Sequence, residues 1–168
     1  MASNPHDAQA VGAEPGPSLE ERRGSAGSAQ GALSALWYRL VAPRWRTLAL
    51  VAPDDGARAW RLAQGLVEVA KGGPTPLKAV NALGASLDRL AAVAHVLSPK
   101  KLQTTSDVTR FIVAADSPLE TPASIGLLSS CDSVVLVLER GRTRIHDGRR
   151  ILQLVGPERF VGAVLGSW

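Results

Sequence analysis

The sequence predicts an α/β fold: a single domain built on a mostly parallel sheet of about five strands, with helices on both faces. The apolar runs at 110–115 and 133–139 are continuous rather than alternating, as in strands that are covered on both faces. Segments with helical spacing of apolar residues lie between such runs, so strands and helices alternate along the chain. One run ends in Asp116, and the carboxyl end of a parallel strand is where open α/β sheets bind ligands.

The chain divides into a tail and a domain. Residues 1–30 are rich in Gly, Ala, Ser, Pro and charged residues and carry few large apolar side chains. Such a segment cannot bury enough surface to offset its ordering entropy, so a disordered tail is predicted, with the domain at 31–168. Apolar residues at helical spacing over 31–40 predict a short amphipathic helix, which Pro43 ends.

The elements of the domain follow from apolar spacing in chain order. Short continuous runs predict strands, and apolar residues three and four positions apart predict helices. The expected elements are a strand at 47–52, a helix at 57–70, a helix at 85–97, a short segment at 98–105, a strand ending at Asp116, a helix at 122–128, a strand at 133–139, a helix at 144–155 and a strand at 160–165. Residues 77–83 fit either a short strand with Asn81 near its end or the start of a helix.

The composition excludes some function classes. The net charge is +4 and the pI about 9.8, which allows contact with nucleic acid, anionic lipid or acidic partners without selecting one. The arginines between Arg140 and Arg150 are interpreted as a solvated helix face. Aromatic and basic residues do not alternate, so no nucleic-acid partner is expected. Cys131 is the only cysteine, which excludes an intrachain disulfide and a multi-cysteine metal site.

We expect a cytoplasmic protein, with the inner face of the cell membrane as an alternative position. The chain does not start with a basic and then apolar signal sequence, and no stretch approaches the ~20 apolar residues that span a bilayer. His6, His95 and His146 lie far apart in the sequence, so no metal site is predicted.

The turn after the first predicted strand stands where a phosphate-binding loop would stand. Such a loop ends in Gly-Lys-Ser/Thr at a helix start, where backbone N–H groups, the lysine and the hydroxyl hold phosphate and magnesium. Here it reads Ala52-Pro53-Asp54-Asp55-Gly56-Ala57-Arg58-Ala59, without lysine or hydroxyl. The adjacent carboxylates would repel a polyphosphate, and Arg58 could supply a cation of different geometry. Alternatively, Asp54 or Asp55 simply caps the helix.

Gly56, Arg58 and Asp116 are therefore the candidate residues of a degenerate nucleotide site. In an active site, Asp116 would hold or orient magnesium through water; otherwise it would cap the turn formed with Ser117-Pro118. No catalytic residue is predicted. The expectation is that no cofactor binds, with ATP and magnesium as the alternative.

Several motifs in the C-terminal half occur in a characteristic order. They are Asp116-Ser117-Pro118-Leu119 after a strand, the strand Cys131-Asp132-Ser133-Val134-Val135-Leu136-Val137-Leu138, the turn Glu139-Arg140-Gly141-Arg142-Thr143 and the strand Val161-Gly162-Ala163-Val164-Leu165. This series resembles the C-terminal half of the bacterial tyrosine kinases of capsule and exopolysaccharide synthesis, in the ParA/MinD group of deviant P-loop ATPases. The resemblance implies a P-loop NTPase-like fold.

The departures from that family are equally specific. The family's first loop ends in Gly-Lys-Ser/Thr, which Asp54 to Ala59 does not match, and the aspartate after its second strand has only Asn81 as a counterpart. The family's tyrosine-rich tail is also missing, since Tyr38 is the only tyrosine. The resemblance therefore implies a pseudokinase: a fold that is kept while the nucleotide chemistry is lost.

The implied function is a non-catalytic regulatory or docking module in exopolysaccharide or capsule biosynthesis or export. Its implied partners are a membrane polysaccharide co-polymerase or a sister ATPase, with a homo-oligomer also open and membrane association only through a partner. Two alternatives remain. One is a divergent active ATPase or tyrosine kinase in which Arg58 replaces the lysine. The other is a ParA/MinD-like regulator of cell division or of other positioning.

Overall fold

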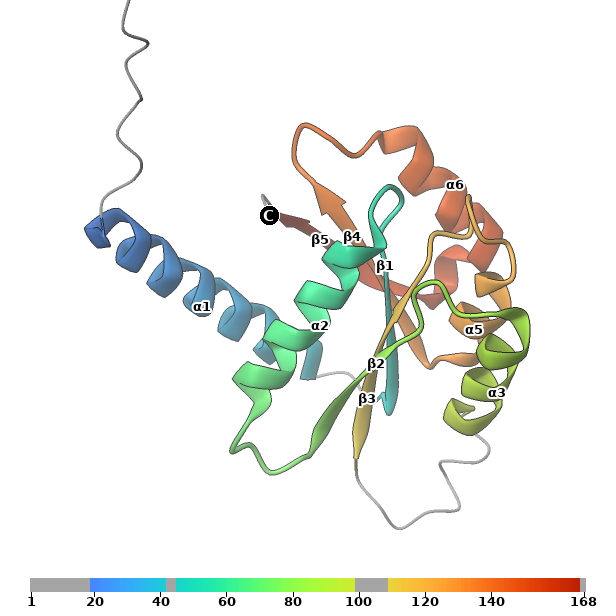
Figure 1. The fold of residues 1–168 in the computed structure, drawn as a ribbon, viewed down its shortest axis with the longest axis horizontal. Coiled ribbons are helices and arrows are strands. Elements are labelled where there is room, and N and C mark those ends of the chain that lie inside the picture. Colours follow the sequence, from blue (N-terminus) through green and yellow to red (C-terminus); the bar gives the residue numbers. More distant parts are fainter. Residues whose placement is uncertain (1–18, 42–44, 99–108, 167–168) are drawn as a thin grey trace, which may run out of the picture.

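The computed structural model describes residues 19–41, 45–98 and 109–166, with side chains from residue 30 onward (Figure 1). Its elements are α1 Leu19–Val41, β1 Thr47–Val51, α2 Gly56–Ala70, β2 Leu77–Asn81, α3 Leu87–Leu97, β3 Arg110–Ala115, α5 Ser124–Ser130, β4 Ser133–Glu139, α6 Ile145–Val155, the 3-10 turn η1 Pro157–Arg159 and β5 Phe160–Gly166.

The strands form one parallel sheet of five strands in the order β2-β3-β1-β4-β5. The central strand β1 pairs with β3 on one side and with β4 on the other, so that Leu48 lies beside Ile112 and Ser133. Every residue of β1 is buried, which explains its continuous apolar sequence. The predicted α/β class with a mostly parallel sheet is confirmed.

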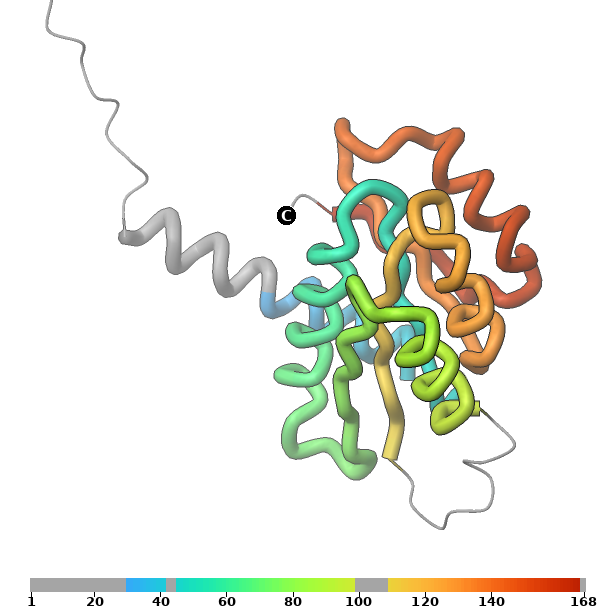
Figure 2. The backbone as a smooth tube through the Cα atoms, turned by 45° about the vertical axis from the view of Figure 1, so that its right-hand side comes forward, coloured from blue at the N-terminus to red at the C-terminus, as the bar shows by residue number. Residues whose placement is uncertain are grey.

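Helices cover both faces of the sheet (Figure 1, Figure 2). On one face, Leu48 and Leu50 of β1 pack with Leu62 and Leu66 of α2, and α1 packs in turn on α2. On the other face, strand residues pack against α3, α5 and α6 in a second apolar cluster. The sheet is thus the middle layer of three, and the edge strand β5 keeps several residues exposed.

Most element boundaries lie within a few residues of those predicted. The ambiguous segment 77–83 forms the strand β2, which is the edge strand beside β3. Helix α1 begins at Leu19, well before the predicted start at residue 31, because 19–30 contains several strong helix formers. The rest of the predicted tail, 1–18, and nearly all of the predicted segment 98–105 lie outside the described residues.

Candidate functional site

The candidate site lies at the carboxyl ends of β1, β3 and β4. The loop after β1 leads to α2 on one face of the sheet, whereas the loop after the neighbouring β3 leads to α5 on the other face. Ligands of open α/β sheets bind where connections diverge in this way. Two of the three candidate residues meet here, since a Cβ atom placed on Gly56 would lie 3.5 Å from Asp116 Oδ1.

This point of divergence is occupied by the loop after β2. A Cβ atom on Gly56 would lie only 2.7 Å from Cδ2 of Leu83, so the Leu83 side chain already rests against the start of α2. The backbone N–H of Gly84 donates a hydrogen bond of 2.7 Å to Asp116 Oδ2. The Asp116 carboxylate is thus held by a neighbouring loop. Capping of the following turn falls instead to Ser117, whose Oγ accepts a hydrogen bond from Leu119 N at 3.3 Å.

Arg58, the third candidate residue, faces a different set of partners. Its side chain is nearly fully buried, and its Nη1 donates a hydrogen bond of 2.7 Å to Asp54 Oδ1. Its Nη2 lies 2.7 Å from Oε2 of Glu139, the last residue of β4. That carboxylate oxygen is buried, and its contact with Nη2 lacks the angles of a hydrogen bond, so charge attraction holds the pair. The structure therefore brings Gly56 and Asp116 together and directs Arg58 toward β4.

A hydroxyl group completes these contacts. Thr143, in the turn after β4, accepts a hydrogen bond from the Glu139 backbone N–H at 2.8 Å. Its Oγ1 also lies 3.2 Å from Asp54 Oδ2, to which it donates. These contacts therefore connect the loop after β1 to the turn after β4. We call the four residues the Arg58 cluster: Asp54, Arg58, Glu139 and Thr143.

The N-terminus of α2 carries its own anion. Asp55 has an extended backbone and its Oδ1 accepts a hydrogen bond of 2.9 Å from Ala57 N, which makes it the helix cap. The capping interpretation of this aspartate is thus confirmed. In a phosphate-binding loop the first N–H groups of the helix would bind the ligand. Here a phosphate would have to displace a carboxylate of the chain itself.

Sequence reasoning missed Leu83, Glu139 and Thr143. The sequence did offer a signal for Glu139, because this residue ends the apolar run 133–139. The carboxyl ends of parallel strands meet at one edge of the sheet, so an acidic residue there is expected near the loop after the first strand. Within the part of the chain that the structure describes, no group of three or more His, Cys, Asp or Glu residues could hold a metal ion. No described helix is both long and apolar enough to cross a membrane.

Two residue groups that could have indicated chemistry pack as structural residues. Cys131 is 1% exposed, and burial, followed by the negative charge of Asp132, raises the pKa of its thiol to about 12. Trp37 and Trp45 meet edge to face with ring centroids 6.4 Å apart. Both observations indicate packing roles for these side chains.

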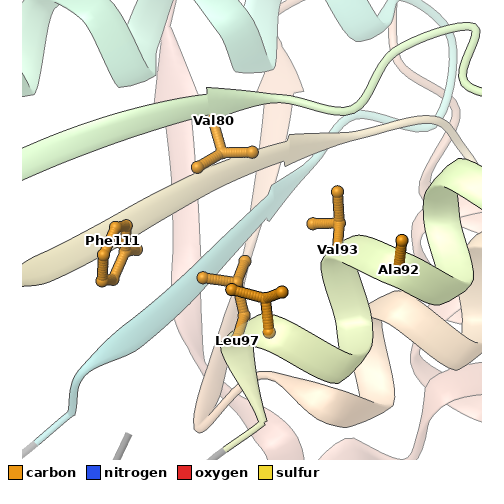
Figure 3. A pocket seen from close by; sticks show the side chains of 6 residues that line it. Val80, Ala92, Val93, Leu97 and Phe111 are labelled. Atoms are coloured by element: carbon orange, nitrogen blue, oxygen red, sulfur yellow. The ribbon is translucent and has the colours of Figure 1, made fainter. Parts of the chain in front are cut away.

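A separate hollow lies between α3 and the edge of the sheet (Figure 3). Its volume is about 290 Å³, and its described lining is apolar, consisting of Val80, Ala92, Val93, Val96, Leu97 and Phe111. These side chains supply no acid, base, nucleophile or metal ligand, so they support no reaction.

Comparisons with known proteins do not assign this chain to a family. No protein-family model, no curated protein and no solved structure matches the chain. The site must therefore be interpreted from its own residues.

Proposed function

We propose that this chain is a non-catalytic, P-loop NTPase-like protein that acts by docking onto other proteins and does not turn over ATP. The observation that carries the proposal is the Arg58 cluster. Among the residues that the structure describes, Arg58 is the only cation at the start of α2 that could replace the missing lysine. Its side chain is nearly fully buried and paired with Asp54 and Glu139.

The electrostatics of the loop support this proposal. Releasing Arg58 to a phosphate would leave the buried Glu139 carboxylate without its close cation, and an uncompensated buried charge costs several kcal/mol. Asp54 and Asp55 would face the incoming polyphosphate, and like charges at close range oppose each other. The divergent-ATPase alternative therefore requires the loop to be rebuilt before a nucleotide binds.

The proposed setting is exopolysaccharide or capsule biosynthesis or export. Its support is the series of motifs within 111–166, which resembles the bacterial tyrosine kinases of those pathways. The proposed partners are the membrane polysaccharide co-polymerase or a sister ATPase. Direct binding to the cytoplasmic segment of a co-polymerase encoded nearby, measured by surface plasmon resonance, tests the setting. Neighbouring division genes and binding to a division protein instead would favour the ParA/MinD-like alternative.

Calorimetric titration with ATP and ADP, with and without magnesium, tests the loss of nucleotide chemistry. We expect no heat of binding for the wild-type chain. Arg58→Ala and Arg61→Ala form a matched pair, because both remove one arginine from α2 and only Arg58 belongs to the cluster. Magnesium-dependent binding in the micromolar range that Arg58→Ala abolishes and Arg61→Ala keeps would overturn the proposal in favour of an active site.

A further inference from the structure

The net charge of the chain is concentrated in one short stretch. Residues 140–150, here called the arginine segment, contain five arginines and a single acidic residue, Asp147. The other 14 basic and 14 acidic residues of the chain cancel, so this segment alone accounts for the net charge of +4. A solvated protein surface usually mixes both signs, and a block of one sign indicates an anionic partner.

The arginines of this segment are exposed and mostly unpaired. No acidic group among the described residues forms an ion pair with Arg140, Arg144, Arg149 or Arg150. Arg142 lies 3.7 Å from Glu139, whose nearer cation is Arg58 at 2.7 Å. Four of the five arginines thus present their charge to solvent without an ion pair to a described acidic group.

The segment also carries an exposed apolar side chain at its centre. Ile145, the first residue of α6, is 76% exposed and stands between Arg144 and His146. The turn that precedes it forms an outer rim of the molecule in both views (Figure 1, Figure 2). Helix α6 buries Gly148, Ile151 and Val155, so its outer face keeps His146, Arg149, Arg150 and Gln153, which line a shallow hollow of about 320 Å³.

We propose that the arginine segment binds an anionic membrane surface directly, with Ile145 entering the headgroup region. Clusters of four to eight basic residues on a helix bind acidic lipid headgroups through charge. An apolar side chain among the cations adds affinity for lipid, whereas a nucleic-acid backbone offers it no matching surface. The rim position suits a flat surface. This inference is independent of the proposed function, in which the protein reaches the membrane only through a partner protein.

Flotation with vesicles tests the proposal. The full chain binds vesicles that contain phosphatidylglycerol and does not bind pure phosphatidylcholine, and binding falls as salt shortens the screening length below ~10 Å. Each basic residue near an anionic leaflet contributes about fivefold, so Arg144→Ala/Arg149→Ala lowers the partition coefficient about 30-fold. The matched control Lys78→Ala/Arg89→Ala removes the same charge from exposed positions elsewhere and changes it less than about threefold.

The apolar contribution has its own matched pair. Ile145→Ser lowers binding about tenfold, whereas Leu87→Ser, at a position 67% exposed on α3, leaves it unchanged. Circular dichroism verifies that these exposed substitutions keep the fold. Equal losses in both double variants, or no binding to anionic vesicles, would overturn the proposal. Tighter binding to duplex DNA or to polyglutamate than to vesicles at the same salt would also overturn it and assign the segment to that partner.

Discussion

At the scale of single residues, the buried contacts of Arg58 predict that this side chain stabilises the fold. Its guanidinium compensates the buried Oε2 of Glu139, and removing one member of a buried ion pair leaves the other charge uncompensated. We predict that Arg58→Ala lowers the free energy of unfolding by about 3 kcal/mol, as measured by urea denaturation. Arg61→Ala removes a side chain that is 54% exposed and lies 3.7 Å from Asp55, so it costs less than about 0.5 kcal/mol.

A double variant separates the buried charge from a general effect of losing arginine. In Arg58→Ala/Glu139→Gln the buried charge at Glu139 is removed, and only the partly exposed Asp54 loses its cation, so about half of the lost stability should return. If Arg58→Ala proved as stable as the wild type, the Arg58 cluster would not hold the loop. The guanidinium would then be available to a ligand, which is the condition that an active nucleotide site needs.

Cys131 makes stability depend on pH in the alkaline range. The pKa of its thiol rises from 9.0 to about 12 on folding, mainly through burial. Above pH 9 the unfolded chain releases this proton while the folded chain retains it, so rising pH favours unfolding until about pH 12. The free energy of unfolding of the wild type should therefore fall by about 1.4 kcal/mol per pH unit relative to Cys131→Ala. Parallel slopes for both proteins between about pH 9 and 11 would contradict this effect.

At the scale of elements, Asp132 connects the starts of two neighbouring strands. Its Oδ2 accepts hydrogen bonds from Arg46 N at 2.8 Å, from Thr47 N at 2.9 Å and from the Thr47 hydroxyl at 3.1 Å. We predict that Asp132→Ala lowers the free energy of unfolding by about 2 kcal/mol, since unsatisfied backbone donors remain at the start of β1. Glu120→Ala, at an exposed position, should stay within about 0.5 kcal/mol of the wild type. Similar losses in both variants, measured by urea denaturation, would count against the connection.

The central strands could be predicted because both of their faces are buried. The residues of β1 are buried throughout and most of those of β3 and β4 are too, which requires uninterrupted apolar sequence. The edge strand β2 carries the exposed Lys78 and Asn81 among partly buried residues, so its five residues fit two patterns equally well. Helix α1 was underestimated because its glycines and serines suggested disorder although its other residues favour a helix.

The candidate site could be predicted only in part. That Gly56 and Asp116 lie together follows from the common edge at which parallel strands end. The pairing of Arg58 with Glu139 depends on β4 lying directly beside β1, and strand order is not encoded in apolar spacing. The same holds for Leu83, which reaches Gly56 from a loop whose strand lies at the edge of the sheet.

At the scale of the whole molecule, the Arg58 cluster and the start of the arginine segment lie at the same edge of the sheet. In the Arg58 cluster the single cation is paired with two carboxylates at the carboxyl ends of β1 and β4. The arginine segment begins one residue beyond Glu139, and of its arginines only Arg142 has an ion pair among the described residues. An α/β sheet usually presents ligand-binding groups at this edge. Here side chains of the chain itself occupy the start of α2, and the exposed arginines lie in the turn that follows β4 and at the start of α6. This arrangement supports the two proposals made above, protein docking and binding to an anionic surface.

The boundary of the folded domain gives the last prediction. The contacts of α1 with the core that the structure describes begin at Leu33, which lies 3.0 Å from the position of a Cβ atom on Gly65 of α2. Removing residues 1–30 should therefore change the free energy of unfolding by less than about 1 kcal/mol. Leu40→Ala, at a position 8% exposed, should lower it by about 2–3 kcal/mol in the same urea titration, because it leaves a cavity between α1 and the sheet. A truncation as costly as Leu40→Ala would place residues before 31 inside the cooperative unit, since only buried contacts have an effect of that size.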